Sequence, residues 1–219
     1  MSKFLPQTLL QILLPMALLC GGLGAAGAQE QRFANLSPAF APQHLAEGRS
    51  TSAPAGYTRF CAEHARDCGS SGRRIVAVHL DDEKEAELDR VNRGVNARVQ
   101  PETDLEHYGE TERWAYPDDG RGDCEDYVLE KRRTLLNLGW PSSVLLITVV
   151  RDREGDGHAV LTVITDRGDL ILDNQEDEIL SWKDTGYRYV KRQSQARATE
   201  WVSLGDTLVP SPPVVGGGR

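Results

Sequence analysis

Apolar residues recur at intervals of three and four between residues 82 and 99, the spacing that places side chains on one face of an α-helix. The residues of this stripe are Leu88, Val91, Val95 and Val99. Asp81 or Asp82 can cap the start of the helix, and Pro101 lies just beyond its end. We therefore predict a helix over this segment that packs through its apolar stripe.

A second amphipathic segment covers residues 122–139 and reads GDCEDYVLEKRRTLLNLG. Asp123 can cap its N-terminus, and Gly139 can end it shortly before the next proline. We predict a second helix here, with Cys124 in its first turn.

Beyond residue 140 the pattern changes, because apolar and β-branched residues follow one another in short runs. The clearest runs are VLLITVV (144–150), HAVLTVIT (158–165) and DLILDN (169–174), and GYRYVKRQ (186–193) and TEWVSLGD (199–206) add one or two further strands. Asp166-Arg167-Gly168 marks a hairpin between the second and third runs. Helices followed by strands predict an α+β fold in which the helices pack on an antiparallel sheet.

The first 28 residues have the pattern of a secretory signal peptide, with Lys3, an apolar run from Leu9 to Cys20, and an Ala-Gly-Ala end. A membrane anchor is the alternative, but the run is shorter than the roughly 20 apolar residues that a membrane-spanning helix needs. A lipoprotein is disfavoured because Leu19 stands where a small residue is expected. We therefore expect a periplasmic protein whose mature chain begins at Gln29.

Both ends of the remaining chain lack the pattern of a folded core. Residues 29–56 contain three prolines and a Ser/Thr/Ala-rich run, which predicts a flexible lead-in. Residues 205–219 end in PSPPVVGGGR and are predicted to form a disordered tail. One folded domain, residues 57–204, lies between them.

Removal of the first 28 residues leaves 191 residues and takes only Lys3 from the charge count. The mature chain then has 24 basic and 33 acidic residues, a net charge of −9 with histidine neutral. This acidic balance argues against a nucleic-acid partner.

Loss of the signal peptide leaves three cysteines, an odd number for an oxidising compartment. Cys61 and Cys68 are close enough in sequence to close a short disulfide loop, which leaves Cys124 free. The alternatives are a buried inert thiol or a Cys-x6-Cys metal pair, although such a pair lacks further ligands at the usual spacing.

Cys124 stands among carboxylates that discourage a thiolate, but the start of a helix favours one through its unpaired N–H groups and its dipole. A cysteine nucleophile also needs a base and a group that orients the base. His158 opens one predicted strand and Asp173 closes the next, so we predict a triad of Cys124, His158 and Asp173. The alternatives are that His158 is an exposed loop histidine and that Asp173 belongs to a turn.

An ideal hairpin opposes this triad. A two-residue turn at Arg167-Gly168 places Asp173 opposite Thr162, four residues from His158 and roughly 13 Å away along the strand. A bulge, a wider turn or a bend near Gly157 is then needed to join the two side chains.

The helix segment GDCEDYVLEKRRTLLNLG, followed by the strand pair HAVLTVITDRGDLILDN, resembles the bacterial transglutaminase-like cysteine proteinases, the LapG family of periplasmic proteases. The resemblance covers about residues 57–204. It implies a papain-like or transglutaminase-like α+β fold with Cys124 as nucleophile, His158 as general base and Asp173 as the residue that orients it.

The resemblance also implies calcium, bound through acids that flank the nucleophile and correspond to Asp123 and Glu125. Calcium needs six to eight oxygen ligands, so loop acids such as Asp104 or Asp118, carbonyls and water must contribute. The alternative is that Asp123 only caps the helix while Glu125 and Asp126 favour its N-terminal dipole.

The predicted function is that of an exported, calcium-dependent cysteine endopeptidase that works through a thioester acyl-enzyme. Members of the LapG family cut a surface adhesin and are controlled by a membrane receptor, which implies a protein substrate and a regulatory partner of these kinds. Two alternatives remain open: a transglutaminase or amidase with the same triad, and a non-catalytic calcium-binding module that docks a partner.

Overall fold

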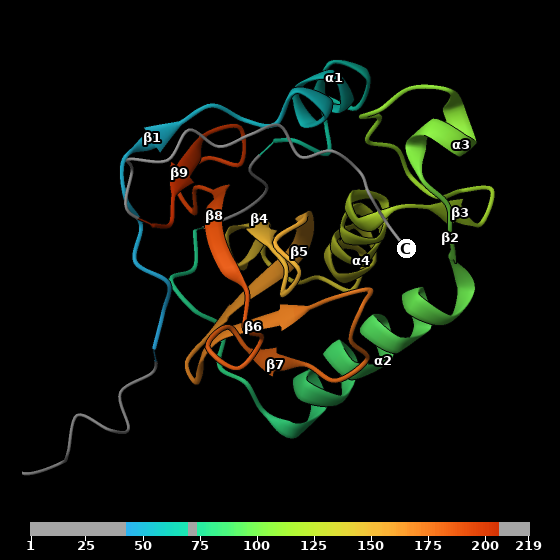
Figure 1. Cartoon of the computed structure of the whole chain (residues 1–219). Coiled ribbons are helices and arrows are strands. Elements are labelled where there is room, and N and C mark those ends of the chain that lie inside the picture. Colours follow the sequence, from blue (N-terminus) through green and yellow to red (C-terminus); the bar gives the residue numbers. More distant parts are fainter. Residues whose placement is uncertain (1–42, 70–73, 206–219) are drawn as a thin grey trace, which may run out of the picture. The chain divides into compact units, whose positions relative to one another are not determined.

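The computed structural model describes residues 43–69 and 74–205 (Figure 1). The predicted signal peptide, residues 1–28, and the predicted tail beyond residue 205 lie outside the described residues. Among the helices that are described, none has both the length and the hydropathy that a membrane crossing requires.

The centre of the domain is a seven-stranded sheet in which every pair of neighbours is antiparallel. Its strand order is β1-β9-β8-β4-β5-β6-β7. The strands are β1 (Ser50–Thr51), β4 (Leu145–Arg151), β5 (Gly157–Thr165), β6 (Gly168–Leu172), β7 (Leu180–Ser181), β8 (Arg188–Gln193) and β9 (Trp201–Ser203). The predicted α+β class and the predicted hairpin between β5 and β6 are therefore confirmed.

Two long helices lie beside the sheet at the positions that the sequence predicts. The helix α2 (Asp82–Arg98) begins directly after Asp81 in the chain. The Asp81 side chain accepts a hydrogen bond from the Lys84 N–H at 2.9 Å. The helix α4 (Cys124–Asn137) packs against β5, and α2 packs against α4 (Figure 1). This arrangement holds the N-terminus of α4 next to the beginning of β5.

Several short elements have no clear signal in the sequence. They are the helices α1 (Ala55–Glu63) and α3 (Asp104–Tyr108), the short 3-10 helix η3 (Ser142–Val144), and the strands β2 (Gln100–Pro101) and β3 (Arg121–Gly122), which pair in parallel as a separate two-stranded sheet. Apart from the nine-residue α1, these elements have two to five residues, which is too short to show periodicity, so tertiary contacts decide their conformation.

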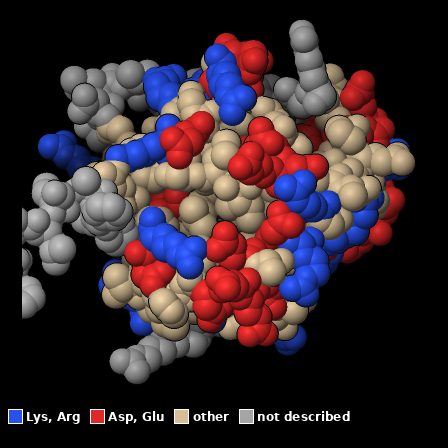
Figure 2. Space-filling model, turned by 90° about the horizontal axis from the view of Figure 1, so that it is seen from below, with Lys and Arg blue, Asp and Glu red and all other residues tan. Residues whose placement is uncertain are grey.

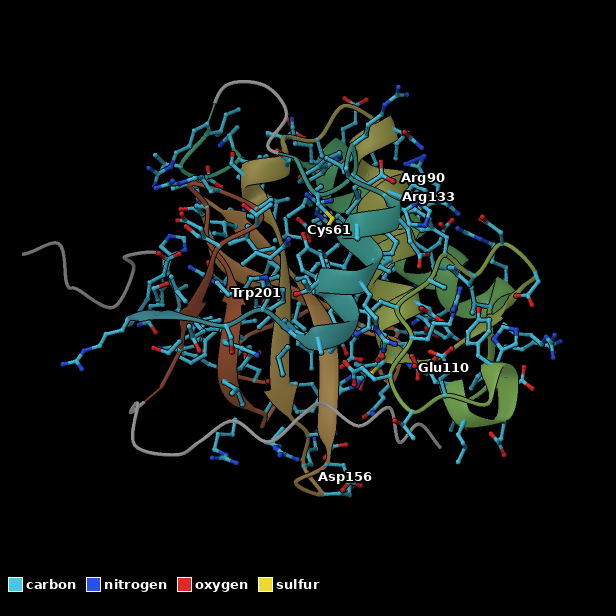
Figure 3. The ribbon with its side chains drawn as sticks, turned by 90° about the horizontal axis from the view of Figure 1, so that it is seen from above. Cys61, Arg90, Glu110, Arg133, Asp156 and Trp201 are labelled. Atoms are coloured by element: carbon cyan, nitrogen blue, oxygen red, sulfur yellow. A yellow bond between two sulfur atoms is a disulfide. The ribbon has the colours of Figure 1, made fainter. Side chains whose placement is uncertain are left out.

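The predicted disulfide is present. Cys61 near the end of α1 is bonded to Cys68, and Figure 3 shows the bond in yellow at the labelled Cys61. The loop that it closes is also attached to α4, because Arg132 donates a hydrogen bond to the Asp67 carbonyl at 3.0 Å. The disulfide excludes the alternative of a metal pair at these two cysteines.

The prediction of a flexible lead-in is wrong for residues 43–56, because this segment is fastened to the domain. β1 pairs with β9, and Leu45 is buried. The His44 imidazole Nδ1 lies 2.6 Å from a carboxylate oxygen of the buried Asp169. A two-residue strand and one buried leucine leave no recognisable pattern in a sequence rich in proline and small residues.

Both faces of the sheet are covered, which explains why eight of the nine residues of β5 are buried. The main core lies on the side of the helices and includes Leu161 and Val163 of β5. A smaller cluster on the other side includes Val160, with Tyr187 from the connection between β7 and β8 packed against it. Continuous apolar runs are expected of strands that are covered on both sides.

Candidate active site

The cysteine of the second predicted helix is the first residue of α4. Cys124 is buried and is the free cysteine among the described residues. Its thiol donates a hydrogen bond to Glu125 Oε2 at a sulfur-to-oxygen distance of 3.0 Å. A free sulfur therefore lies at a helix N-terminus, where backbone N–H groups favour negative charge.

The surroundings of this thiol oppose that effect. The pKa of Cys124 is raised by burial first and then by the negative charges of Glu125 and Asp123, while a hydrogen bond from the Ala159 N–H acts to lower it. This contact places the sulfur at the start of β5, because Ala159 is the residue that follows His158. Burial and the neighbouring acids thus both oppose ionisation of the thiol.

His158 and Asp173 lie together in the interior. The imidazole Nε2 of His158 donates a hydrogen bond to Asp173 Oδ1 at 2.8 Å, and both side chains are almost fully buried. The exposed-loop alternative for His158 is therefore wrong. Nδ1 is left as the ring nitrogen that can accept a proton.

The hairpin register explains how this pair is reached. Thr165 pairs with Gly168, so the turn residues are Asp166 and Arg167, and Leu172 lies opposite Leu161. Our expectation that Asp173 lies opposite Thr162 was therefore wrong by two residues. Asp173 follows the last residue of β6, and the continued register points to the position two residues from His158, within reach of a diagonal contact.

The Asp173 carboxylate has two further donors. The Tyr187 hydroxyl donates to Oδ2 at 2.6 Å, and the Gln175 N–H donates to Oδ1 at 3.0 Å. Burial alone would raise the pKa of Asp173, but the hydrogen bonds from His158 and Tyr187 outweigh it and lower that pKa. Asp173 is therefore held as a carboxylate that faces the imidazole.

The role of Tyr187 could not be inferred from the sequence. It belongs to GYRYVKRQ, a predicted strand in which Tyr187 and Tyr189 occupy alternate positions. The sequence does not indicate which of the two tyrosines contacts Asp173. Only the path of the β7–β8 connection brings one of them to Asp173.

A cluster of acids lies next to Cys124. Asp123 is the residue before α4, but its side chain makes no capping hydrogen bond, and neither of its buried carboxylate oxygens has a partner among the described residues. The alternative that Asp123 acts as a helix cap is therefore wrong. Carboxylate oxygens of Asp104, Asp123 and Asp126 all lie within 4.8 Å of one another.

The parallel β2–β3 pair accounts for this cluster, since it fixes the two loops side by side. The Glu102 N–H donates to the Gly122 carbonyl at 3.1 Å, which brings Asp104 near Asp123. The Ala115 N–H holds Asp126 Oδ1 at 2.7 Å and leaves Oδ2 without a partner among the described residues.

The other proposed ligands differ in their positions. Glu125 groups with Asp123 and the Cys124 sulfur, and its buried Oε1 has no partner within the described part of the chain. Asp118 instead accepts a hydrogen bond from Arg133 at 2.6 Å. The geometry thus favours Asp104 over Asp118 and adds Asp126, which the sequence assigned only to the helix dipole.

Burial raises the pKa of Asp104, Asp123, Glu125 and Asp126, and repulsion within the cluster adds to the rise for Asp123, Glu125 and Asp126. Burial is the larger cause for each, followed by the charge of Asp104 for Asp123 and by the charge of Asp123 for Glu125 and Asp126. The pKa of Asp126 reaches about 9. Buried, unpaired and mutually repelling oxygens of this kind suit a hard cation such as Ca²⁺, which prefers carboxylate ligands.

A buried lysine lies on the same helix as Cys124. Lys131 is completely buried, and its ammonium has no hydrogen-bond partner among the described residues. Burial lowers its pKa to about 7, against the charges of Asp173 and Asp177. The burial of Lys131 could not be predicted from the sequence, because a lysine in an amphipathic helix is normally assigned to the exposed face.

Acidic side chains are also prominent on the surface. Figure 2 views the molecule from the side on which α2 and β7 lie in Figure 1, and Asp and Glu gather densely there. The exposed Asp177 and Glu178 belong to the segment between β6 and β7. This distribution agrees with the net charge of −8 of the whole chain.

Comparison with known proteins identifies one family. The family model described as bacterial transglutaminase-like cysteine proteinase matches residues 47–208. The match begins before residue 57, our predicted start of the domain, and includes β1. No curated protein matches the chain.

Solved structures of Legionella pneumophila LapG are similar to this chain. The calcium-bound form is 27% identical, with 60% of this chain and 76% of that chain covered and a TM-score of 0.48. A second LapG structure is 30% identical, with 56% and 71% covered and a TM-score of 0.47. The EGTA-treated form is 27% identical, with 58% and 70% covered and a TM-score of 0.46.

Proposed function

Because the chain belongs to the bacterial transglutaminase-like cysteine proteinase family, a family of cysteine peptidases, we propose that it is an exported, calcium-dependent endopeptidase with Cys124, His158 and Asp173 as its triad. One observation carries the proposal. A buried imidazole is fixed by a carboxylate at 2.8 Å, and the next residue along β5 is in contact with a free sulfur at a helix N-terminus.

The proposed reaction is acyl transfer to the enzyme followed by hydrolysis. The Cys124 thiolate attacks the carbonyl carbon of a peptide bond, and the carbon–nitrogen bond then breaks as the His158 imidazolium gives its proton to the leaving amine. Water attacks the resulting thioester while His158 accepts a proton, which releases the carboxylic acid and restores the thiol. In this reaction the backbone N–H of Cys124 would help hold the oxyanion.

Calcium dependence is supported by the buried acids. Asp104, Asp123 and Asp126 would hold the cation, with Glu125 at the border between this group and the sulfur. A bound cation supplies positive charge that offsets the carboxylates whose repulsion raises the pKa of Cys124. Gly122 leaves room for this cluster. Any other residue at that position would place a Cβ 2.6 Å from Asp126 Oδ2.

The predicted signal peptide and the disulfide between Cys61 and Cys68 support an extracytoplasmic location. The substrate class that follows is a periplasmic or cell-surface protein, such as an adhesin, with a membrane receptor as the regulatory partner. These assignments rest on the resemblance of the GDCEDY segment and of the strand pair that follows it.

The reactivity of Cys124 tests the proposal. The mature protein is treated with iodoacetamide-alkyne in 1 mM CaCl2 or in EGTA, beside Cys124→Ala and His158→Ala. We expect labelling at Cys124 that is far faster than labelling of free glutathione, that slows in EGTA, and that is largely lost in His158→Ala. Labelling at the glutathione rate under both conditions would refute the enzyme assignment.

A second measurement separates hydrolysis from amine transfer. The wild-type and Cys124→Ala proteins are incubated with cell-surface proteins of the source bacterium in the presence of dansylcadaverine. New N-termini that depend on Cys124 support an endopeptidase. Dansyl incorporation without new N-termini would instead identify a transglutaminase.

A further inference from the structure

One side chain, Tyr187, donates a hydrogen bond to Oδ2 of Asp173, the carboxylate oxygen that does not contact His158. Asp173 Oδ1 accepts hydrogen bonds from His158 Nε2 and from the Gln175 N–H, whereas Oδ2 accepts from the Tyr187 hydroxyl at 2.6 Å. No other hydrogen bond to Oδ2 occurs within residues 43–69 and 74–205. Tyr187 therefore fixes the half of the carboxylate that the imidazole does not touch.

Within the described part of the chain, the backbone of Asp173 is not held by strand pairing. β6 ends at Leu172, so Asp173 lies beyond the ladder that holds β5 and β6 together. The Asp173 carbonyl is held by an amide N–H of Asn96 at 2.9 Å, but that bond does not set the rotation of the carboxylate. Orientation of the side chain thus depends on its own hydrogen bonds.

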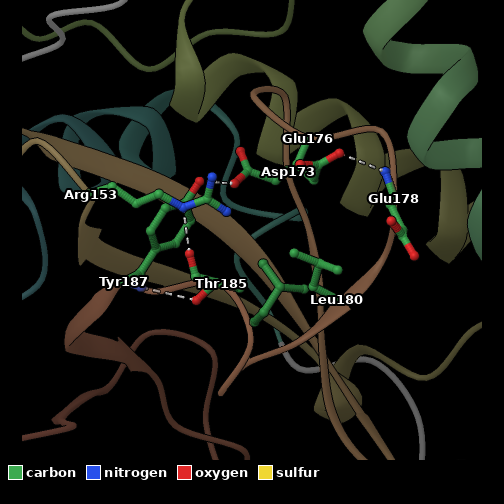
Figure 4. Close-up of a pocket in the computed structure, with 8 residues that line it drawn as sticks. Arg153, Asp173, Glu176, Glu178, Leu180, Thr185 and Tyr187 are labelled. Carbon is green, nitrogen blue, oxygen red and sulfur yellow. Dashed lines mark hydrogen bonds between the residues drawn. The ribbon is translucent and has the colours of Figure 1, made fainter.

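Tyr187 is itself fixed from several directions. Its N–H donates to Thr185 Oγ1 at 3.2 Å, and its ring lies edge-on to the His158 ring with the centroids 5.8 Å apart. The Arg153 guanidinium lies over the same ring at 5.8 Å and donates from Nε to the Thr185 carbonyl at 2.9 Å. Figure 4 shows Arg153, Thr185 and Tyr187 converging beside Asp173.

Tyr187 and Asp173 both line a small pocket. This pocket is lined by Arg153, Thr185 and Tyr187 on one side and by Leu180 and Glu178 on the other (Figure 4). Asp173 belongs to its lining but is almost completely buried. Tyr187→Phe removes the hydroxyl and keeps the ring, so it isolates the contribution of the hydrogen bond to Asp173.

We propose that Tyr187 is a positioning residue of the active site, which acts through Asp173 to hold the His158 imidazole toward Cys124. The hydroxyl prevents the carboxylate from rotating away from Nε2, and it satisfies an oxygen that would otherwise be buried without a partner. This inference rests on the proposed function, because it assigns Tyr187 a role only if Asp173 orients a catalytic histidine.

The test compares Tyr187→Phe with Tyr189→Phe in the full mature protein with 1 mM CaCl2. Tyr189 is a matched control, since it is a buried tyrosine of the same segment whose hydroxyl bonds Thr185 at 3.1 Å rather than Asp173. The probe is iodoacetamide, and the readout is the second-order rate constant for alkylation of Cys124 at pH 7. We expect about a tenfold loss in Tyr187→Phe, the scale of one hydrogen bond to a charged group, and less than a twofold change in Tyr189→Phe.

Two further readouts distinguish positioning from general stability. In the background of Asp173→Asn, Tyr187→Phe should change the rate less than twofold, because a residue that acts through Asp173 has nothing left to orient. The proton NMR signal of His158 Nε2–H should move in Tyr187→Phe and stay in place in Tyr189→Phe. Melting temperatures of the two tyrosine variants should be similar.

The inference is overturned if Tyr187→Phe keeps the wild-type rate and the wild-type Nε2–H signal, or if its effect persists undiminished in Asp173→Asn. These results leave the proposed function intact, provided that Asp173→Asn itself slows alkylation. A wild-type thiol that reacts no faster than glutathione would overturn both.

Discussion

The hydrogen bond between His158 Nε2 and Asp173 Oδ1, 2.8 Å long, joins the start of β5 to the residue that follows β6. Fifteen positions separate the two residues along the chain. The hairpin between them converts that separation into contact, and its register determines whether the pair forms. The same strand start is the place where α4 brings Cys124 against Ala159.

The buried acids make the stability of the metal-free protein depend on pH. In the native state the pKa values of Asp123 and Asp126 lie above the ordinary value of 3.8, and that of Asp126 is about 9. Between those values the native protein retains protons that the unfolded chain has released, so a rise in pH favours unfolding. In EGTA we predict a melting temperature that falls from pH 5 to pH 8.

Calcium should reverse this trend, because it binds the ionised form of the same carboxylates. The increase in melting temperature caused by 1 mM CaCl2 should therefore be larger at pH 8 than at pH 5. Differential scanning fluorimetry measures both effects. A melting temperature in EGTA that rises steadily from pH 5 to pH 8 would contradict this description of the acids.

The choice of calcium ligands predicts different effects for two aspartates. Asp126→Asn should weaken calcium binding by about tenfold or more, the scale expected for loss of a charged group at a metal site. Asp118→Asn should leave the affinity unchanged, since Asp118 is exposed and pairs with Arg133. Isothermal titration calorimetry measures both dissociation constants, and equal effects of the two substitutions would reject the cluster.

Lys131 should cost stability when it carries its charge. The pKa of this buried lysine is lowered to about 7 in the native protein, so below pH 7 an unpaired ammonium is buried, and above pH 7 the native state loses its proton while the unfolded chain keeps one. The native protein consequently gains stability from this group as pH rises from 7 toward 10.

We therefore predict that Lys131→Met increases the free energy of unfolding by about 2 kcal/mol at pH 6, and by less at pH 9. Urea denaturation at the two pH values is the measurement. A loss of stability at pH 6 would show that the ammonium has a partner that offsets its burial.

The disulfide should contribute stability without taking part in the chemistry. Its loop is short, so Cys61→Ala combined with Cys68→Ala should lower the free energy of unfolding by roughly 2 to 3 kcal/mol. Alkylation of Cys124 should stay within twofold of wild type at 25 °C, because the bond joins α1 to a loop outside the proposed triad. Urea denaturation and alkylation rates test the two statements, and a slow Cys124 in a folded variant would refute the second.

Helices and strands with a sustained pattern could be predicted from the sequence. The stripe of α2 and the apolar runs of β4 to β6 are long enough for periodicity to identify them, and Asp81 caps α2 as expected. β1, β2 and β3 contain two residues each, which is too few for any pattern. Their positions depend on pairing between segments that are far apart in sequence.

In the candidate site, too, some residues could be predicted from the sequence and others depend on tertiary contacts. Cys124, His158 and Asp173 stand out in the sequence because each lies at the boundary of a predicted element. The contribution of Asp104 depends on the parallel contact between β2 and β3, and that of Tyr187 depends on the course of the β7–β8 connection. The expected hairpin register was wrong by two residues because the sequence Asp166-Arg167-Gly168 permits more than one two-residue turn.

The most direct test of the central claim is the reaction of the mature protein with p-nitrophenyl acetate in 1 mM CaCl2, followed by peptide mapping. The account predicts a burst of about one p-nitrophenolate per protein molecule, an acetyl group on Cys124, and a burst rate at least about 100-fold lower in His158→Ala. Acetylation at other residues only, or a Cys124 burst that is equally fast in His158→Ala, would contradict it.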